Sequence, residues 1–339
     1  MMASLNNDND EQAEKLRTFS KTVKEQGYEG IDLFEKIATR TVEIKETQRT
    51  NRCRRCWHDK LTRCICSYIP PLAESSVKLP IKVIVLMHYK EYYSAGNDAK
   101  LMLALLPGKR QRSQLYVFGR NGDWGKFQEE CSLDPDHTLL LWPAENSLTV
   151  DGFISNLPED SPWRQRAERM QQENDDNDDD DDDDDDDDVV NDVPNSTEND
   201  TTAATCTLPT LRVIVLDGVY SQARSMFKTI NRRFPTSSIL VPVPPHVALH
   251  PKTLSVYHRA LKNYAQSSAV TVRNSSDPNA LHICSVEAFA LLMKELGEWE
   301  QTTKALVKAV EINNLALVHD VNVRPPPPSP QENKKAATT

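Results

Sequence analysis

The sequence has no apolar run of about 18 residues, the length that a membrane-spanning helix needs. Residues 1–15 lack an apolar core as well, so we expect no secretory signal. A G-x-G-x-x-G motif after a strand, a Walker A loop and a G-x-S-x-G elbow are all missing, which argues against dinucleotide binding, phosphate-loop chemistry and an α/β-hydrolase. We therefore expect an intracellular protein, in the nucleus, the cytoplasm or both, with no membrane partner.

Apolar residues are also scarce, at 38%, which indicates that part of the chain is disordered. The formal net charge of −10 comes from one segment, because residues 173–200 carry 17 acidic side chains and no Lys or Arg. Without this segment the chain has 40 basic and 33 acidic side chains, a net charge of about +7. A mildly basic folded part fits an anionic partner such as a nucleic acid.

Seven cysteines in a chain without an export signal favour reduced thiols or a metal site over disulfides. Four of them form the pattern C-x2-C-x7-C-x-C, whose two close pairs can supply four thiolates to one tetrahedral zinc ion. A complete thiolate shell makes such a zinc structural, and the alternative is a set of four reduced surface thiols. His58, inside the loop, is expected on the surface. The four cysteines are Cys53, Cys56, Cys64 and Cys66.

Short apolar runs without polar alternation are typical of strands that are buried on both faces. Such runs alternate here with helical stretches at 95–106 and 221–233, which predicts an α/β domain with a mostly parallel sheet. Two amphipathic helices are expected within 285–320, separated near Gly297. The predicted strands are 81–88, 114–119, 137–143, 212–217 and 237–243.

The predicted main domain spans residues 51–320 and follows an N-terminal extension, residues 1–50. Residues 1–10 are expected to be disordered, and about two helices should follow up to residue 50. The acidic region at about 164–207 is predicted to be a disordered insertion between two strands of one sheet. Residues 321–339 read as a disordered, proline-rich tail.

Polar residues stand where predicted strands end, and ligands of open α/β sheets bind outside these carboxyl ends. His88 and Asp217 each end a strand. Asn97 can be either a functional group or the cap of a helix at 98–106. Ser285 is expected as the N-cap of a later helix, and ordinary capping is also the alternative for Glu287 in its first turn.

Taken in order, these motifs resemble the DTW-domain family, the tRNA-uridine aminocarboxypropyltransferases. The resemblance covers about residues 50–310 apart from the acidic insertion. It implies a fold similar to the knotted SPOUT superfamily, tRNA as partner, S-adenosylmethionine as co-substrate and transfer of its 3-amino-3-carboxypropyl group to N3 of a uridine. The residues that carry it are the four cysteines, His88 with Glu91, Asn97, the D-G-V-Y-S-Q-A segment at 217–223, Arg273, and the C-S-V-E-A segment at 284–288.

The resemblance assigns Asp217 as the catalytic base and places the other matching residues around the co-substrate. Tyr220 would stack on adenine or uracil, and Arg273 or Glu287 would bind the amino-acid end of the donor. Basic residues after the motif would contact tRNA phosphates or simply form a solvated helix face. The co-substrate-binding residues are His88, Glu91, Asn97, Gly218, Tyr220, Gln222, Arg273, Ser285 and Glu287; the basic residues are Arg224, Lys228, Arg232 and Arg233.

The sequence departs from the family pattern at five positions: Val219, Tyr220, Asp98, and Cys284 with Ser285 in place of a Ser-Thr pair. Val219 replaces a threonine, and loss of that hydroxyl is expected to weaken co-substrate contacts by about 0.5–1.5 kcal/mol. Two alternatives therefore stay open, a zinc-stabilised RNA-binding protein with weakened catalysis and an S-adenosylmethionine-dependent RNA methyltransferase. The sequence leaves the oligomeric state open.

Overall fold

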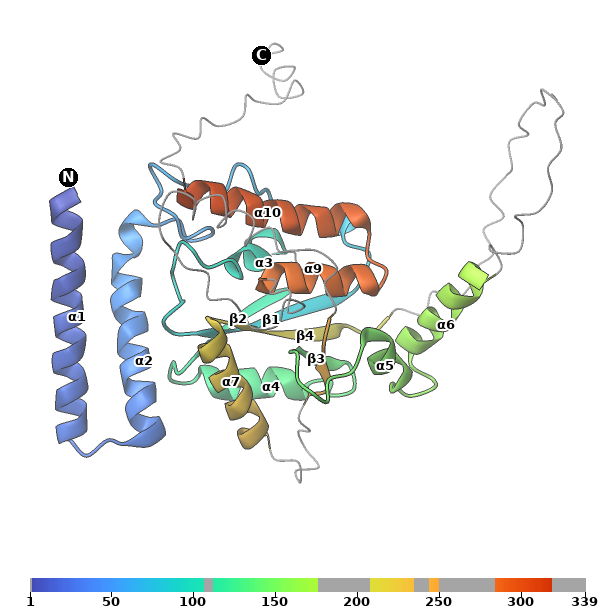
Figure 1. Ribbon diagram of the computed structural model, residues 1–339, viewed down its shortest axis with the longest axis horizontal. Helices are drawn as coiled ribbons and strands as arrows, with labels where there is room; N and C mark the ends of the chain where they lie inside the picture. Colours follow the sequence, from blue (N-terminus) through green and yellow to red (C-terminus); the bar gives the residue numbers. More distant parts are fainter. Residues whose placement is uncertain (1, 107–111, 176–207, 235–243, 250–283, 319–339) are drawn as a thin grey trace, which may run out of the picture.

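The computed structural model describes residues 2–106, 112–175, 208–234, 244–249 and 284–318. Five strands in these residues form one parallel sheet in the order β2-β1-β4-β3-β5, which confirms the predicted α/β class (Figure 1). The predicted strand 237–243 lies outside the described residues. The strands are β1 (Ile81–His88), β2 (Ser113–Phe118), β3 (Thr138–Leu141), β4 (Leu211–Asp217) and β5 (His246–Val247).

The central strands β1 and β4 are apolar along their length because helices cover both faces of the sheet. One face is covered by α3, α9 and α10, which we call the α9 layer, and the other by α4 and α7, the α7 layer (Figure 1). The bounds are α3 (Lys100–Leu105), α9 (Ser285–Glu295) and α10 (Glu300–Val318), with α4 (Asp123–Ser132) and α7 (Tyr220–Arg233) opposite.

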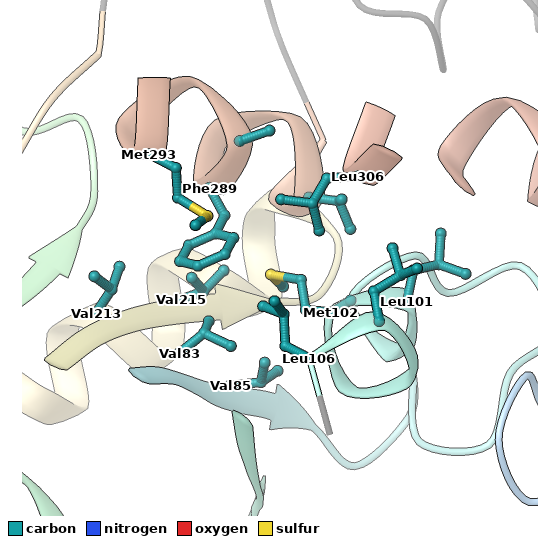
Figure 2. Close-up of a cluster of buried hydrophobic side chains, with 14 of the residues drawn as sticks. Val83, Val85, Leu101, Met102, Leu106, Val213, Val215, Phe289, Met293 and Leu306 are labelled. Atoms are coloured by element: carbon teal, nitrogen blue, oxygen red, sulfur yellow. The ribbon is translucent and has the colours of Figure 1, made fainter. Parts of the chain in front are cut away.

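Side-chain alternation along β4 divides its residues between these layers. Val213 and Val215 belong to the core under the α9 layer, where Figure 2 shows them below Phe289 and Met293. Ile214 and Leu216 belong to the core of the α7 layer. The two helices predicted within 285–320 are confirmed as α9 and α10, with a turn between them at 296–299.

The N-terminal extension consists of two helices, α1 (Met2–Glu25) and α2 (Gly30–Thr47). Helix α1 begins at Met2, so the expected disorder of residues 1–10 is wrong; once a helix is nucleated, each further residue adds a hydrogen bond at little cost. Helix α2 lies against the end of β2, where a Cβ on Gly119 would come within 2.6 Å of the Ala38 Cβ. A short 3-10 helix, Gln48–Asn51, connects the extension to the main domain.

The start of the predicted acidic insertion is also ordered, because α6 (Pro162–Asp175) follows α5 (Val150–Ser155). Trp163 is buried and donates its indole N–H to the Pro209 carbonyl oxygen at 2.9 Å. Arg166 donates to the Leu296 carbonyl oxygen at 2.8 Å. These contacts hold the first turns of the helix in spite of the charged sequence, so disorder from residue 164 is wrong. The remainder of the insertion, 176–207, and the tail 321–339 lie outside the described residues.

Among the described helices, none is both long and apolar enough to cross a membrane. A second 3-10 helix, Glu74–Ser76, precedes β1.

Candidate functional site

The connections after β1 and β4 leave the sheet in opposite directions. The chain after β1 continues to α3 in the α9 layer, whereas the chain after β4 enters α7 directly (Figure 1). β1 and β4 are neighbours in the sheet, with Met87 paired to Asp217 at their carboxyl ends. Such a divergence between neighbouring parallel strands opens the crevice in which ligands of α/β sheets bind.

Asp217 lies at this point and belongs to the α9 side of β4, because it shares the alternation of Val213 and Val215. Its side chain is only 2% exposed. The Asn97 amide donates a hydrogen bond to Oδ2, and the Ser285 hydroxyl donates to Oδ1 at 3.3 Å. Three segments that are far apart in the sequence therefore meet on one carboxyl group.

The surroundings of Asp217 raise its pKa into the range where the carboxyl group gains and loses its proton slightly above neutral pH. Burial raises its pKa from 3.8 to about 8, and the carboxylates of Asp98 and Glu91 add to this effect. The hydrogen bonds from Asn97 and Ser285 act in the opposite direction because they stabilise the charged form. A carboxyl group with such a pKa matches what general acid–base chemistry at physiological pH requires.

Two of the five family departures, Asp98 and Cys284, touch each other beside this group. The Cys284 thiol hydrogen-bonds to the Asp98 carboxyl group, whose pKa is raised mainly by burial. The Asp98 Oδ2 oxygen is out of contact with solvent and has no hydrogen-bond partner. Asp98 thus links the loop after β1 to the start of α9 and leaves one acceptor oxygen unused.

Lys100 is a member of this neighbourhood that the sequence analysis missed. It is fully buried, and burial lowers its pKa to about 7, although the charges of Cys56, Asp98 and Asp217 favour its protonated form. Its Nζ donates to the Ala95 carbonyl oxygen. A single lysine at the start of the apolar run K-L-M-L-A-L-L was the available signal.

The caps of the two helices correct one prediction. The N-cap of α9 is Cys284 and not Ser285, which leaves the Ser285 hydroxyl for Asp217. Glu287 accepts a hydrogen bond from the Cys284 backbone N–H at 3.1 Å, the ordinary capping contact that was its alternative. Gln222 makes the equivalent contact at α7, accepting from the Val219 N–H at 2.9 Å.

Asn97 is not the N-cap of the helix predicted at 98–106, because α3 begins at Lys100 and its N-cap is Ala99. The Asn97 side-chain oxygen accepts from the Lys100 backbone N–H at 3.2 Å, and its amide nitrogen donates to Asp217. Glu91 is half-buried in the turn that follows β1, where its backbone N–H donates to the His88 carbonyl oxygen at 2.9 Å.

His88 lies on the other side of the sheet from the Asp217 side chain. It shares the alternation of Ile84 and Leu86 and packs near Phe118, at 6.2 Å between ring centroids. Burial, with some help from Lys90 and Lys45, lowers its pKa to about 4, so it is neutral at pH 7.

Gly218 sits between the two strand ends, where a Cβ would come within 3.3 Å of the His88 Cβ and 2.8 Å of the Gln222 Oε1. The predicted residues therefore form two groups. Asn97 and Ser285 hydrogen-bond to the Asp217 carboxyl group, Glu91 acts on it through its charge, and Glu287 caps α9. The other group lies on the α7 side and consists of His88, Gly218, Tyr220 and Gln222. Arg273 lies outside the described residues.

Val219 and Tyr220 point outward from the start of α7. Val219 is 56% exposed and occupies the N-cap position of α7, where a hydroxyl would be able to cap the helix. The expected loss of co-substrate contacts at this position stays a prediction. Tyr220 is 64% exposed and stacks on Trp142 with 6.0 Å between centroids and 15° between planes. Trp142 in turn stacks on Phe227 at 5.0 Å.

The four cysteines converge as their spacing predicts. All four Sγ atoms lie within 4.8 Å of one another, with Cys53 and Cys66 at 3.4 Å and Cys56 and Cys64 at 3.8 Å. Four sulfur atoms around a tetrahedral zinc at about 2.3 Å would be about 3.8 Å apart, so small shifts of the thiols would be enough for the cluster to hold a metal ion.

His58 is buried and not on the surface as predicted, because its Nε2 hydrogen-bonds to the Asn313 Oδ1 of α10 at 2.8 Å. The cysteine loop also supports the site, since Trp57 stacks on Tyr93 at 5.2 Å and Arg52 donates to the Tyr93 carbonyl oxygen at 2.6 Å. Tyr93 belongs to the segment between β1 and Asn97, so the cysteine loop fixes the chain that carries Asn97.

The fold and the site define an α/β protein that has a parallel sheet with a buried carboxyl group at its switch point, and a separate four-cysteine module that could hold a metal ion. The sequence model of the DTW domain matches residues 50–314, and the chain belongs to this family, the tRNA-uridine aminocarboxypropyltransferases. Membership supports a role in tRNA modification with tRNA as substrate. No curated protein and no solved structure matches the chain.

Proposed function

We propose that the protein transfers the 3-amino-3-carboxypropyl group of S-adenosylmethionine to N3 of a tRNA uridine. The observation that carries this proposal is the buried Asp217 carboxyl group, held by Asn97 and Ser285 at the switch point of a DTW domain. Uracil N3–H is a weak acid, so its attack on carbon needs a base in a site that excludes water. Asp217 meets both requirements.

In this reaction Asp217 removes the N3 proton as N3 bonds to the carbon attached to the sulfonium. That carbon–sulfur bond breaks, its electron pair stays on sulfur, and methylthioadenosine leaves. S-Adenosylmethionine supplies the transferred group. Its positively charged sulfonium departs as a neutral thioether. Asn97 and Ser285 orient the carboxylate before the proton moves and stabilise its charged form.

The charges of the site fit such a donor. Asp98 has an unused buried acceptor oxygen, and Asp98 and Glu91 together place negative charge beside Asp217. A substrate with an ammonium and a sulfonium group would relieve this like-charge repulsion. We assign Glu91 to the ammonium end, Arg273 to the carboxylate and Tyr220 to a base.

The remaining predicted residues have a supporting role in this proposal. Glu287 and Gln222 fix the starts of α9 and α7, and His88 and Gly218 form the wall between the strand ends. The four cysteines would hold a structural zinc ion, because a closed thiolate shell leaves no position for substrate.

The test uses S-adenosylmethionine labelled in the carboxyl carbon or in the methyl group, with tRNA as acceptor. Carboxyl label should enter the tRNA with wild-type protein and with Asp160→Asn, an exposed control, but not with Asp217→Asn. Entry of methyl label alone would show a methyltransferase. Binding of tRNA without either label would show an RNA-binding protein, and both results would overturn the proposal.

A further inference from the structure

The exposed side of α7 carries one aromatic and three basic residues at intervals of four, which we call the α7 ridge: Tyr220, Arg224, Lys228 and Arg232. Residues four apart lie on the same side of a helix, about 6 Å further along its axis. The ridge begins three residues after Asp217 and leads away from it. It therefore connects the proposed reaction centre to the surface.

The charges of the ridge differ from those on the exposed surface of α10. Helix α7 contains no acidic residue, and no ion pair among the described residues includes Arg224, Lys228 or Arg232. By contrast, Lys304 and Lys308 on α10 pair with acids of their own helix, at 2.9 and 2.7 Å. A merely solvated helix face commonly carries such internal pairs, so the unpaired cations of α7 indicate an anionic partner.

Arg233, the fourth basic residue of the helix, does not belong to the ridge. It pairs with Glu35 of α2 at 3.7 Å and lies over the Trp124 ring at 5.1 Å. This residue therefore attaches α7 to its surroundings, and the prediction that it contacts tRNA phosphates is replaced by a packing role.

The aromatic end of the ridge has the geometry of a stacking platform. One face of Tyr220 rests on Trp142, which is itself fixed on Phe227, and Tyr220 is 64% exposed. A ring supported on one side and open on the other offers its free face to an unpaired base. Aromatic stacking beside a row of cations is the recurring way in which proteins bind single-stranded nucleic acid.

We propose that the α7 ridge binds an unpaired RNA strand of the tRNA, next to the target uridine, with Tyr220 stacked on a base and the three basic residues on successive phosphates. The position of the target uridine rests on the proposed function, but the binding of the strand does not. An unpaired strand is the occupant that uses both features, since a duplex hides its base faces and an acidic peptide has none.

The test measures binding of unmodified tRNA at several salt concentrations, without S-adenosylmethionine. Replacing Arg224, Lys228 and Arg232 by Ala should lower the salt slope of log affinity by about 2 and weaken binding at least about tenfold. The matched control replaces Lys294, Lys304 and Lys308 by Ala in the α9 layer. It removes the same charge from exposed positions and should leave the slope unchanged.

Tyr220 variants test the stacking part. Tyr220→Ala should weaken binding of a single-stranded oligonucleotide about 5- to 100-fold, whereas Tyr220→Phe keeps the ring and should bind like the wild type. Equal losses in the ridge variant and its control would overturn the proposal, as would tighter binding of a duplex or of a poly-Asp peptide. Strand binding by the ridge without carboxyl-label transfer would contradict the proposed function alone.

Discussion

The two layers of helices on the sheet differ in what they bring to the carboxyl ends of the strands. The α9 layer presents the buried Asn97 and the half-buried Asp98 and Ser285 around the Asp217 carboxyl group. The α7 layer presents the exposed side chains of the α7 ridge, which are Tyr220 and three basic residues. Because side chains alternate along β4, its neighbouring positions serve both layers. In the proposed function, this alternation separates proton transfer at Asp217 from RNA binding on α7.

The largest effect should follow from removing the metal ligands of the α9 side. Cys64→Ser with Cys66→Ser should abolish zinc binding and unfold the cysteine loop, because zinc contributes about 10–16 kcal/mol to such folds. Loss of the Trp57–Tyr93 contact should then free Asn97 and stop transfer. Zinc content and thermal unfolding measure this. Cys131→Ala, buried in the α7 layer, should keep about one zinc per chain; if the double variant also keeps its zinc, the module is not a metal site.

Asp217→Asn should make the protein more stable at high pH. The pKa of Asp217 is raised in the folded state, so wild-type stability falls as pH rises from about 4 to about 8, the window in which the unfolded chain is ionised first. The variant avoids this penalty, and its free energy of unfolding should exceed that of the wild type by a few kcal/mol at pH 9 and match it near pH 4. Urea unfolding at the two pH values measures the difference, and a gap independent of pH would contradict the assigned burial.

Ser285→Ala and Asn97→Ala each remove a hydrogen-bond donor to the buried Asp217 carboxyl group. Each should raise the activation free energy of transfer by about 1–3 kcal/mol. Ser285→Thr keeps the hydroxyl and should restore most of the rate. Single-turnover transfer with saturating tRNA measures the effect on the chemical step apart from tRNA binding. The tRNA affinity should not change. A loss of affinity equal to the loss of rate would break the division between the layers.

Asp98→Asn removes a negative charge that raises the pKa of Asp217. This charge is the largest cause of the raised pKa after burial. The rising limb of the pH–rate profile should therefore move to lower pH, because the base loses its proton earlier. The profile of the ridge variant, which changes only the α7 layer, should coincide with that of the wild type. An unchanged limb in Asp98→Asn would show that this charge does not act on the base.

The smallest effect concerns the exposed cap of α7. Val219→Thr restores a capping hydroxyl and should stabilise the protein by about 1 kcal/mol without changing transfer. Chemical unfolding and the KM for S-adenosylmethionine measure the two quantities. A large drop in the KM for S-adenosylmethionine would show that the side chain at position 219 contacts the co-substrate.

The central strands could be predicted because both their faces are buried, and the cysteine cluster because its ligands lie close together in the sequence. The contact between Asp98 and Cys284 could not, since it depends on how α9 docks beside the loop after β1. The opposite orientations of His88 and Asp217 follow from strand register, and the shift of the cap from Ser285 to Cys284 is a difference of one residue. The helix at 162–175 depends on the burial of Trp163 against the core, which a charged sequence does not reveal.

The most direct test of this account is the single-turnover rate of carboxyl-label transfer by Asp217→Asn with saturating tRNA at pH 8. The account predicts a rate at least about 100-fold below that of the wild type, with the tRNA affinity unchanged. Transfer at the wild-type rate would contradict the assignment of Asp217 as the base and, with it, the division of chemistry and binding between the two layers.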